Sequence, residues 1–276
     1  MTPIWSEVVE RALAEDIGRG DITTNTLIPA GQEAEAVLIA REDLVVCGLP
    51  VLAEVFRQID SRIRLNPEIS DGNGLMAGNT ICTLRGPARG ILTGERVALN
   101  FLQNLSAVAS LTLQFVEKVK DTDCRIVDTR KTVPGMRLLQ KYAVRVGGGH
   151  NHRMGLDDGV LIKENHIAVA GGIKEAVEGV RSSLTHLHRI EVECETLEQM
   201  DQALEAGAHI ILLDNMDTDT MREAVRINNG RALLEASGNV NLESVRDIAE
   251  CGVDMISIGA LTHSAGNKDV SLLVRF

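Results

Sequence analysis

The stretch IEVECETLEQMDQALEAGAHIILLD, residues 190–214, decides the fold class of this chain. An apolar run opens it, a helical pattern of apolar residues covers 197–206, and a second apolar run closes it on Asp214. Strand, helix and strand in close succession are typical of a parallel β-α-β unit, whose strands are buried on both faces. The stretch therefore predicts an α/β fold with a parallel sheet covered by helices.

The same rhythm recurs on both sides of this stretch. Further apolar runs are IVDTR at 126–130, GVLIKEN at 159–165, ALLEASG at 232–238 and MISIGA at 255–260. Helical patterns cover 173–183, 220–228 and 242–251. Together with the two strands above, these runs give six predicted parallel strands, which indicates a barrel or an incomplete barrel.

A polar residue or a glycine closes or follows each of these predicted strands. In chain order they are Asp128, Lys163, Glu193, Asp214, Ser237 and Gly259. The carboxyl ends of the strands meet at one face of a β/α barrel, where the chemistry takes place. We therefore expect these residues to surround one mouth.

The segment DTRKTVPGMRLLQKYAVRVGGGHNHRMGLDDGVLIKENH, residues 128–166, concentrates positive charge at this mouth. Between Arg125 and Lys163, eight Lys or Arg residues stand against three Asp, a balance of +5 in a chain of net charge −11. A glycine run at 147–149 adjoins these cations. Arg and Lys pair with carboxylates and phosphates, so the segment predicts a basic pocket for a small substrate with several negative charges.

The first third of the chain mixes helices and strands without a repeating unit. We expect helices over 3–16 and 49–59, a loop over 18–31, a strand over 33–43, two short strands within 71–90, and a long helix over 92–120. A domain boundary is expected near the middle of that long helix. The C-terminal VSLLVRF, residues 270–276, is a predicted strand whose partner the sequence leaves open.

Composition excludes several function classes. Aromatic residues make up only 2% of the chain and the pI is near 5.2, which argues against a nucleic-acid partner. No leader pattern and no apolar run of membrane-spanning length is present, so we expect a cytoplasmic protein. The five Cys are scattered without a CxxC pair, so buried thiols are expected in place of disulfides or zinc ligands.

Some polar residues have a structural and a functional interpretation. Arg130 and Lys131 could belong to a solvated loop, but they directly follow a strand, which favours a functional role at the mouth. Lys163 closes an apolar run, where an unpaired buried ammonium would be costly and a nearby anion would explain it. Strand alternation puts Glu191 and Glu193 on the same side, and Glu193 lies nearer the mouth.

The glycines that close the last two barrel strands suggest a phosphate site. Ser237-Gly238 and Gly259-Ala260 occupy positions where barrels often bind phosphate through backbone N–H groups. Arg96, beside Glu95, has no role on composition alone and would pass for a surface ion pair.

Three further functions stay open on these residues. A Schiff-base aldolase would use Lys163 as its nucleophile. A metal-dependent hydrolase would use His150 and His152, although glycines and no strand precede them. A non-catalytic binding or scaffold barrel is disfavoured by the many charged groups at strand ends.

The chain resembles the quinolinate phosphoribosyltransferases, the carboxylating nicotinate-nucleotide pyrophosphorylases. Motifs along nearly the whole chain carry the resemblance: EDIGRGDITT at 15–24, GERVALNFLQNLS at 94–106, the segment 128–166, IEVECE at 190–195, ILLDNM at 211–216, LEASGN at 234–239 and ISIGALTH at 256–263. One position departs from the pattern, since members often carry a second Gly where Asn239 stands.

The resemblance implies an N-terminal α/β sandwich domain over 1–107, joined by the C-terminal tail 265–276, and an open, incomplete α/β barrel over 108–264. It implies a homodimer in which Arg96 reaches into the active site of the neighbouring subunit.

The resemblance also implies a reaction. Quinolinate would accept the phosphoribosyl group of phosphoribosyl pyrophosphate and lose carbon dioxide, giving nicotinate mononucleotide and pyrophosphate in NAD biosynthesis. The enzyme would be a pentosyltransferase that uses Mg²⁺. A related pyrophosphorylase acting on a different base is the nearest alternative.

Site residues follow from the family motifs. Lys131, Lys163, Glu193 and Asp214 would be catalytic, and Glu193 and Asp214 would meet Mg²⁺ mainly through the substrate pyrophosphate. The residues that would bind substrate are Arg96, Thr129, Arg130, Lys131, His152, Arg153, Lys163, Glu193, Asp214, Ser237, Gly238, Asn239, Ser257, Gly259, Ala260 and His263.

Overall fold

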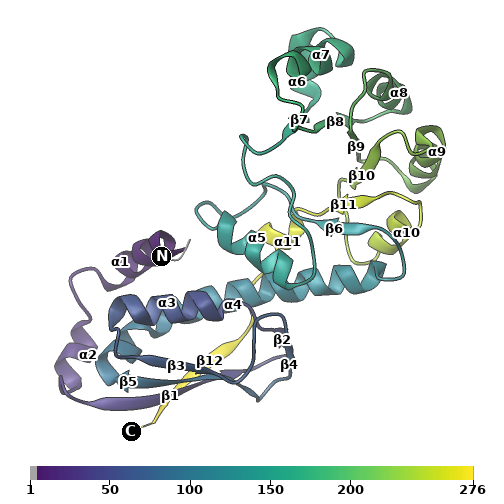
Figure 1. Ribbon diagram of the computed structural model, residues 1–276. Coiled ribbons are helices and arrows are strands. Elements are labelled where there is room, and N and C mark those ends of the chain that lie inside the picture. The colour runs from purple at the N-terminus through teal and green to yellow at the C-terminus, as the bar shows by residue number, and fades with distance from the viewer. Residues whose placement is uncertain (1–4, 276) are drawn as a thin grey trace. The chain divides into compact units, whose positions relative to one another are not determined.

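The computed structural model describes residues 5–275, which divide into two compact units (Figure 1). Unit 1 contains residues 5–113, 132–148 and 261–275, and unit 2 contains 114–131 and 149–260. The long helix α4 (Ala88–Val119) belongs to unit 1 as far as residue 113. No helix among residues 5–275 is long and apolar enough to cross a membrane.

Unit 1 is built on a four-stranded antiparallel sheet in the order β12-β1-β5-β3. Its strands are β1 (Glu33–Ala40), β3 (Arg64–Pro67), β5 (Thr80–Pro87) and β12 (Val270–Arg275), and β2 (Leu44–Val45) pairs with β4 (Gly74–Leu75). The helices of this unit, besides the first part of α4, are α1 (Ser6–Ile17), α2 (Ile22–Leu27), α3 (Leu49–Ile59), α5 (Arg137–Val146) and α11 (Ala260–His263, of which Ala260 belongs to unit 2).

The sheet of unit 1 forms because buried apolar side chains recur at every second position of its strands. In β1 the side chains of Ala36, Leu38 and Ala40 are completely buried, and β12 adds the buried Val270 and Leu272. The C-terminal strand pairs antiparallel with β1, with Leu38 opposite Leu272. The predicted helix over 49–59 is confirmed as α3, which runs along the sheet (Figure 1). The first two residues of the helix predicted over 3–16 lie outside the described residues.

The predicted loop over 18–31 is wrong for Ile22–Leu27, which form α2. The Asp21 side chain caps this helix by accepting a 2.9 Å hydrogen bond from the Thr24 backbone N–H. Its two largest apolar residues, Ile22 and Leu27, are 83% and 71% exposed. The helix therefore lacks the apolar periodicity that would have revealed it, and only its cap marks it.

Unit 2 is an open barrel of six parallel strands in the order β6-β11-β10-β9-β8-β7. The strands are β6 (Arg125–Val127), β7 (Val160–Ile162), β8 (Ile190–Cys194), β9 (Ile210–Asp214), β10 (Leu233–Ser237) and β11 (Met255–Ser257). The helices are α6 (Glu164–Ala170), α7 (Ile173–Ser183), α8 (Leu197–Glu205), α9 (Thr218–Asn228) and α10 (Val245–Ala249). The predicted fold class, an α/β sheet domain followed by an incomplete α/β barrel, is confirmed.

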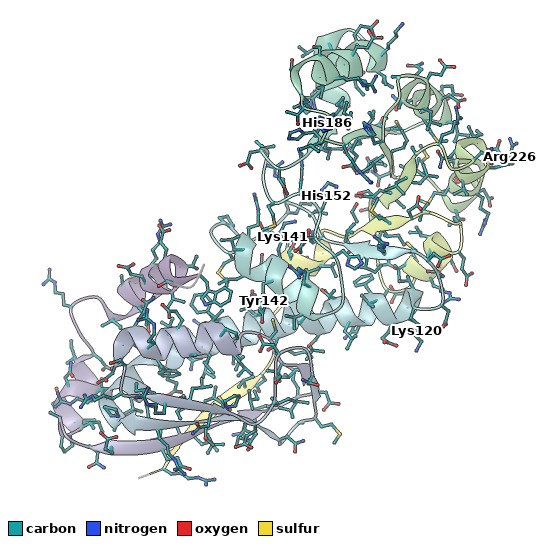
Figure 2. The ribbon with its side chains drawn as sticks, in the orientation of Figure 1. Lys120, Lys141, Tyr142, His152, His186 and Arg226 are labelled. Atoms are coloured by element: carbon teal, nitrogen blue, oxygen red, sulfur yellow. The ribbon has the colours of Figure 1, made fainter. Side chains whose placement is uncertain are left out.

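The helices of unit 2 cover the outside of its strands (Figure 1). Arg226 points outward from α9, whereas His152 lies toward the interior of the barrel (Figure 2). All five Cys of the chain are buried and free of disulfides, as expected from their spacing.

Gly147 ends α5 within unit 1, where it permits a close approach to α4. A Cβ at this position would lie 2.4 Å from the Ala109 carbonyl oxygen and 2.7 Å from the Thr112 Cβ. The expectation that the glycine run 147–149 adjoins the substrate pocket is therefore wrong for Gly147, whose absent side chain serves helix packing. The helix α5 itself was not predicted.

Gly147→Ala should lower the free energy of unfolding by about 1–3 kcal/mol, because the new methyl group overpacks the contact with α4. Gly179→Ala is the matched control, since Gly179 is exposed within α7 and a Cβ there would meet nothing within 4 Å. That variant should be unchanged or more stable by about 1 kcal/mol. Urea denaturation followed by circular dichroism compares the two, and equal stabilities would contradict the packing role.

Candidate active site

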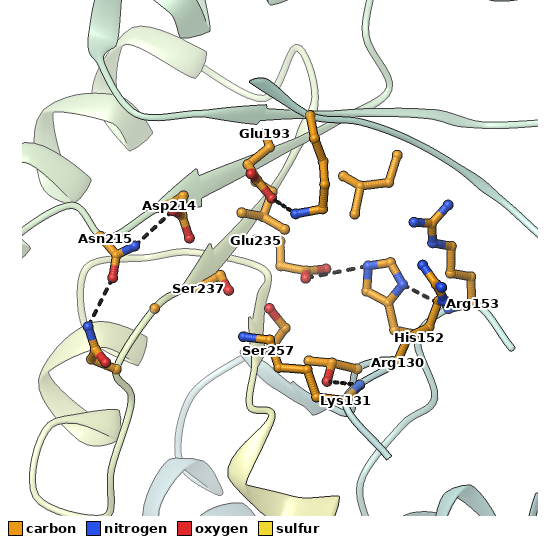
Figure 3. Close-up of a pocket in the computed structure, with 16 residues that line it drawn as sticks. Arg130, Lys131, His152, Arg153, Glu193, Asp214, Asn215, Glu235, Ser237 and Ser257 are labelled. Atoms are coloured by element: carbon orange, nitrogen blue, oxygen red, sulfur yellow. Dashed lines mark hydrogen bonds and ion pairs between the residues drawn. The ribbon is translucent and has the colours of Figure 1, made fainter. Parts of the chain in front are cut away.

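A cavity of about 580 Å³ opens at the carboxyl ends of the strands of unit 2 (Figure 3). All of its lining residues belong to unit 2. Four cations face it: Arg130, Lys131, Arg153 and Lys163. Three acids face it as well: Glu193, Asp214 and Glu235. The remaining lining residues are Thr129, His152, Leu161, Leu212, Asn215, Ser237, Gly238, Asn239 and Ser257.

Lys163 and Glu193 form an ion pair across two neighbouring strands. Lys163 follows β7, and Glu193 lies in β8, which pairs with β7 in parallel. Burial raises the pKa of the Glu193 carboxyl, while the Lys163 ammonium acts in the opposite direction. The pair explains how a lysine can close an apolar strand, as its charge is matched by a carboxylate.

A chain of side-chain contacts joins the ends of β9 and β10. Asn215 Nδ2 donates a 2.8 Å hydrogen bond to Asp214 Oδ2, and Asn239 Nδ2 donates a 3.2 Å hydrogen bond to Asn215 Oδ1. Gly238, at φ +100°, lies so close that a Cβ there would be 2.1 Å from Asn215 Oδ1. Gly238 is therefore required by the fold, and Asn239 ties the two strand ends together.

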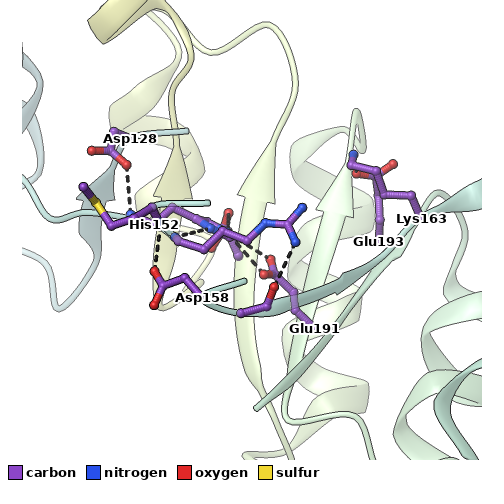
Figure 4. Close-up of polar contacts among 10 residues, drawn as sticks. Asp128, His152, Asp158, Lys163, Glu191 and Glu193 are labelled. Atoms are coloured by element: carbon purple, nitrogen blue, oxygen red, sulfur yellow. Dashed lines mark hydrogen bonds and ion pairs between the residues drawn. The ribbon is translucent and has the colours of Figure 1, made fainter. Parts of the chain in front are cut away.

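The inner wall of the cavity holds a cluster of His152, Glu191 and Glu235, of which Figure 4 labels His152 and Glu191 and Figure 3 labels Glu235. His152 Nε2 lies 3.1 Å from Glu191 Oε2 and 3.5 Å from Glu235 Oε1. The other ring nitrogen, Nδ1, accepts a 2.8 Å hydrogen bond from the Arg153 backbone N–H. These contacts favour the tautomer in which Nε2 carries the proton and faces the two carboxyl groups.

Asp128 is completely buried and holds the segment that carries His152. Its carboxylate accepts hydrogen bonds from Asn151 Nδ2 at 2.6 Å and from the His152 backbone N–H at 2.9 Å. Backbone bonding between Val127 and His150 continues β6 on the same edge. Asp128 thus positions the wall of the cavity and does not line it, contrary to the expectation that it would border the mouth.

The structure brings together most of the residues predicted for the site. Twelve of the sixteen predicted substrate-binding residues line the cavity: Thr129, Arg130, Lys131, His152, Arg153, Lys163, Glu193, Asp214, Ser237, Gly238, Asn239 and Ser257. Gly259 and Ala260 follow β11 but are not among the lining residues. Arg96 and His263 are exposed and belong to unit 1.

The prediction that the +5 stretch surrounds the pocket is wrong in part. Four of its eight cations line the cavity, whereas Arg125 begins β6 at the opposite end of the strand. Arg137, Lys141 and Arg145 lie in α5, in unit 1. The charge counted along the sequence overestimated the positive charge of the pocket, because α5, with three of the cations, lies outside the barrel.

Sequence reasoning missed Glu235, Asn215, Leu161 and Leu212 among the lining residues. A signal for Glu235 was available, because it precedes Ser237 by two residues in β10 and so shares its side of the strand. Asn215 adopts a positive φ of 54°, a conformation that asparagine tolerates. Neither hydrophobic periodicity nor strand alternation predicts this conformation.

The cluster on the inner wall has the ligand types of a metal site. Its three candidate ligand atoms lie within 4.8 Å of one another. Both ring nitrogens of His152 are engaged by protein groups, however, and Arg153 interacts electrostatically with Glu191. His150, the second histidine of the HxH pair, is exposed and is not part of this cluster among the described residues. The arrangement suits a shared proton better than a cation.

Lys163→Met should raise the pKa of Glu193 further, because burial would remain while the ammonium that favours the charged carboxylate is lost. Lys174→Met on the exposed face of α7 is the control and should leave Glu193 unaffected. Carboxyl-selective ¹³C NMR titration measures the shift. A pKa of Glu193 that is the same in both variants would show that the ion pair does not form in solution.

Comparison with protein families matches both parts of the chain. The C-terminal domain model of quinolinate phosphoribosyl transferase matches residues 108–273, and its N-terminal domain model matches 21–106. A probable nicotinate-nucleotide pyrophosphorylase [carboxylating] of Bacillus subtilis is 43% identical over 258 residues, which cover 94% of this chain and 89% of that protein. The nicotinate-nucleotide pyrophosphorylase [carboxylating] of Mycobacterium leprae is 43% identical, with 96% and 95% covered.

Solved structures agree with these relatives. The nicotinate-nucleotide pyrophosphorylase from Francisella tularensis superposes with a TM-score of 0.95 at 42% identity, covering 100% of this chain and 98% of that one. The corresponding protein from Ehrlichia chaffeensis gives a TM-score of 0.95 at 43% identity, with both chains fully covered. With both domain models matched in order, this chain belongs to the quinolinate phosphoribosyltransferase family.

Proposed function

We propose that this protein transfers the phosphoribosyl group of phosphoribosyl pyrophosphate to quinolinate, a step of NAD biosynthesis. The products are nicotinate mononucleotide, pyrophosphate and carbon dioxide. The observation that carries the proposal is one cavity, in a chain of this family, that combines four cations with the Glu193–Asp214 acid pair. Both substrates are polyanions, and the transfer passes through a centre that becomes positive.

The four cations bind and orient the two anionic substrates. Arg130, Lys131 and Arg153 stand on one side of the cavity, on the segments that follow β6, and Lys163 stands at the end of β7. Arg pairs with a carboxylate in a planar fork, whereas Lys acts as a point charge. Holding the ring nitrogen of quinolinate against ribose C1 is the main contribution of this cluster, since positioning alone can supply several kcal/mol of the barrier.

Glu193 and Asp214 act on the ribose. The C1 centre gains positive charge as pyrophosphate leaves, and two fixed carboxylates stabilise that charge in a site shielded from water. Lys131 and Lys163 take up the negative charge of the leaving group. Before this, Glu193 must leave Lys163 and contact the substrate. In the absence of substrate, the two residues neutralise each other as an ion pair.

The acid pair also fits Mg²⁺. This ion binds through one or two carboxylates together with substrate phosphates, and Glu193 and Asp214 offer such oxygens at the cavity. When bound, Mg²⁺ would neutralise charge on the pyrophosphate. The unit 2 residues proposed to hold the 5′-phosphate are Ser237 and Gly238, which line the cavity, and Gly259, which follows β11.

The Schiff-base alternative finds little support at Lys163. A nucleophilic lysine needs a neutral amine in an apolar or cationic environment. Lys163 is ion-paired with Glu193, and its side chain is 42% exposed, so its environment is neither apolar nor cationic.

A product assay tests the proposed reaction. Purified protein with quinolinate, phosphoribosyl pyrophosphate and Mg²⁺ should form nicotinate mononucleotide, followed by chromatography, and nicotinate in place of quinolinate should give none. Arg130→Ala should lower turnover by roughly 10²-fold or more, because orientation of both substrates depends on it. Arg125→Ala is the matched control from the same basic stretch, at the far end of β6, and should keep wild-type activity. Product from neither acid would favour a related pyrophosphorylase with another base.

We further propose a homodimer in which Arg96 completes the site of the neighbouring subunit. Arg96 is exposed on α4 of unit 1, whereas the cavity described above is lined entirely by unit 2. The cytoplasmic location expected from the sequence stays a prediction.

Hybrid dimers test the shared site. Arg96→Ala and Lys163→Ala proteins should each be inactive, and mixing them with subunit exchange should restore about a quarter of the wild-type sites, because each mixed dimer carries one intact site. Exchange is verified with differently tagged subunits. Complete inactivity of the purified mixed dimer would refute the contribution of Arg96 across the interface.

A further inference from the structure

Glu235 is a buried carboxyl group on the inner wall of the cavity that the steps above leave without a role. The proposed reaction, on which this inference rests, requires one more group. When carbon dioxide leaves ring carbon C2, the electron pair of the broken bond stays on C2. A proton has to reach that carbon before the product is nicotinate mononucleotide.

We propose that Glu235 is the acid that donates this proton. The C2–carboxylate bond breaks, its electron pair remains on C2, and the Glu235 O–H proton moves to C2 to form the C–H bond. Glu235 is left as a carboxylate and regains a proton from water once the product has gone. No oxidant or further reactant is needed for this step.

The geometry places the Glu235 carboxyl at the floor of the cavity. Ser237 and Asp214 are paired in register at the mouth, and Glu235 lies two residues deeper in β10, beside Leu212. At about 3.3 Å per residue, Glu235 lies one inward-facing position, roughly 7 Å, below Asp214, and it is level in register with Glu193, which also pairs with Leu212. Glu235 points into the cavity toward His152 (Figure 3). A planar dicarboxylate held by the cations of the cavity would present one edge to it.

Glu235 is the cavity acid best placed to carry a proton. Its side chain is 3% exposed, and Oε1 accepts no hydrogen bond from any of the described residues. Glu193 is ion-paired with Lys163, and Asp214 accepts a hydrogen bond from Asn215. Of the three lining acids, Glu235 is the most deeply buried, and its Oε1 faces His152 Nε2 at 3.5 Å without a hydrogen bond.

The surroundings of Glu235 raise its pKa, so that a substantial share of the molecules carry its proton near neutral pH. Burial and the neighbouring Glu191 carboxylate raise its pKa to about 7, and Asp128 adds to this, while His152 and the Ser257 hydroxyl oppose it. These groups come from β8, from the end of β6, from the segment that carries His152 and from β11. A dianionic substrate in the cavity would raise the pKa of Glu235 further, so substrate binding favours the protonated carboxyl group.

Glu235→Gln tests the role, because glutamine keeps the shape and cannot donate an acidic proton. In a single turnover, pyrophosphate release should stay within about threefold of wild type, while carbon dioxide release should slow by roughly 10²-fold. The undecarboxylated dicarboxylate mononucleotide should accumulate and be detected by chromatography. Glu205→Gln on the exposed surface of α8 is the matched control and should change neither step.

Carbon dioxide release that keeps pace with pyrophosphate release in Glu235→Gln would overturn the proposal. A wild-type protein that releases no pyrophosphate from quinolinate would instead overturn the proposed function and this role with it. If the variant does not fold, the pH dependence of the wild-type protein tests the proposal instead. Its decarboxylation step should slow as the pH rises above about 7, through the pKa that Glu235 has with substrate bound, without a matching change in pyrophosphate release. A pH-independent decarboxylation step would refute the role.

Discussion

Parallel pairing of six strands is the constraint on which this site depends. Because β6 to β11 run in one direction, their carboxyl ends open on one edge, and side chains from distant parts of the chain converge there. Strand alternation then sorts each side chain inward or outward. Glu191 and Glu193 share the inward side of β8, and Glu235 and Ser237 share that of β10. The register places Asp214 and Ser237 at one level, Glu193 and Glu235 at the next, and Glu191 one inward-facing position deeper.

The charges of the cavity are balanced in two ways. At the mouth, Lys163 holds Glu193, so that each group is partnered until a substrate separates them. On the floor, Glu191 and Glu235 are too close and too deeply buried to be ionised together at low cost, and His152 lies between them. The first arrangement readies the site for anions, and the second stores a proton. The two functions proposed for the acids, charge stabilisation and proton donation, follow from these different surroundings.

Close packing constrains the segments that carry the site. Gly238 fits beside Asn215 only because it lacks a side chain, and the Asn239 amide joins the same contact. Asp128 fixes the return of the chain from α5 by binding Asn151 and the His152 backbone. Along the chain, α5 lies between Asp128 and Asn151. This helix belongs to unit 1 and ends at Gly147 against α4. The basic segment 128–166 is therefore divided between the two units, although it is continuous in sequence.

Local patterns in the sequence determined the fold class, the six strands and four of the helices between them, because periodicity is a property of short segments. Strand-end position together with the family motifs gave twelve of the cavity-lining residues. The sequence could not reveal α2, which lacks an apolar face, or the partner of the C-terminal strand, because β-pairing joins segments far apart along the chain. Charge counted along the sequence could not separate the four cations of the cavity from the four elsewhere, whereas the family motifs singled out the four that line it. The acid cluster of His152, Glu191 and Glu235 depends on distances between three separate segments, and only the tertiary structure decides such distances.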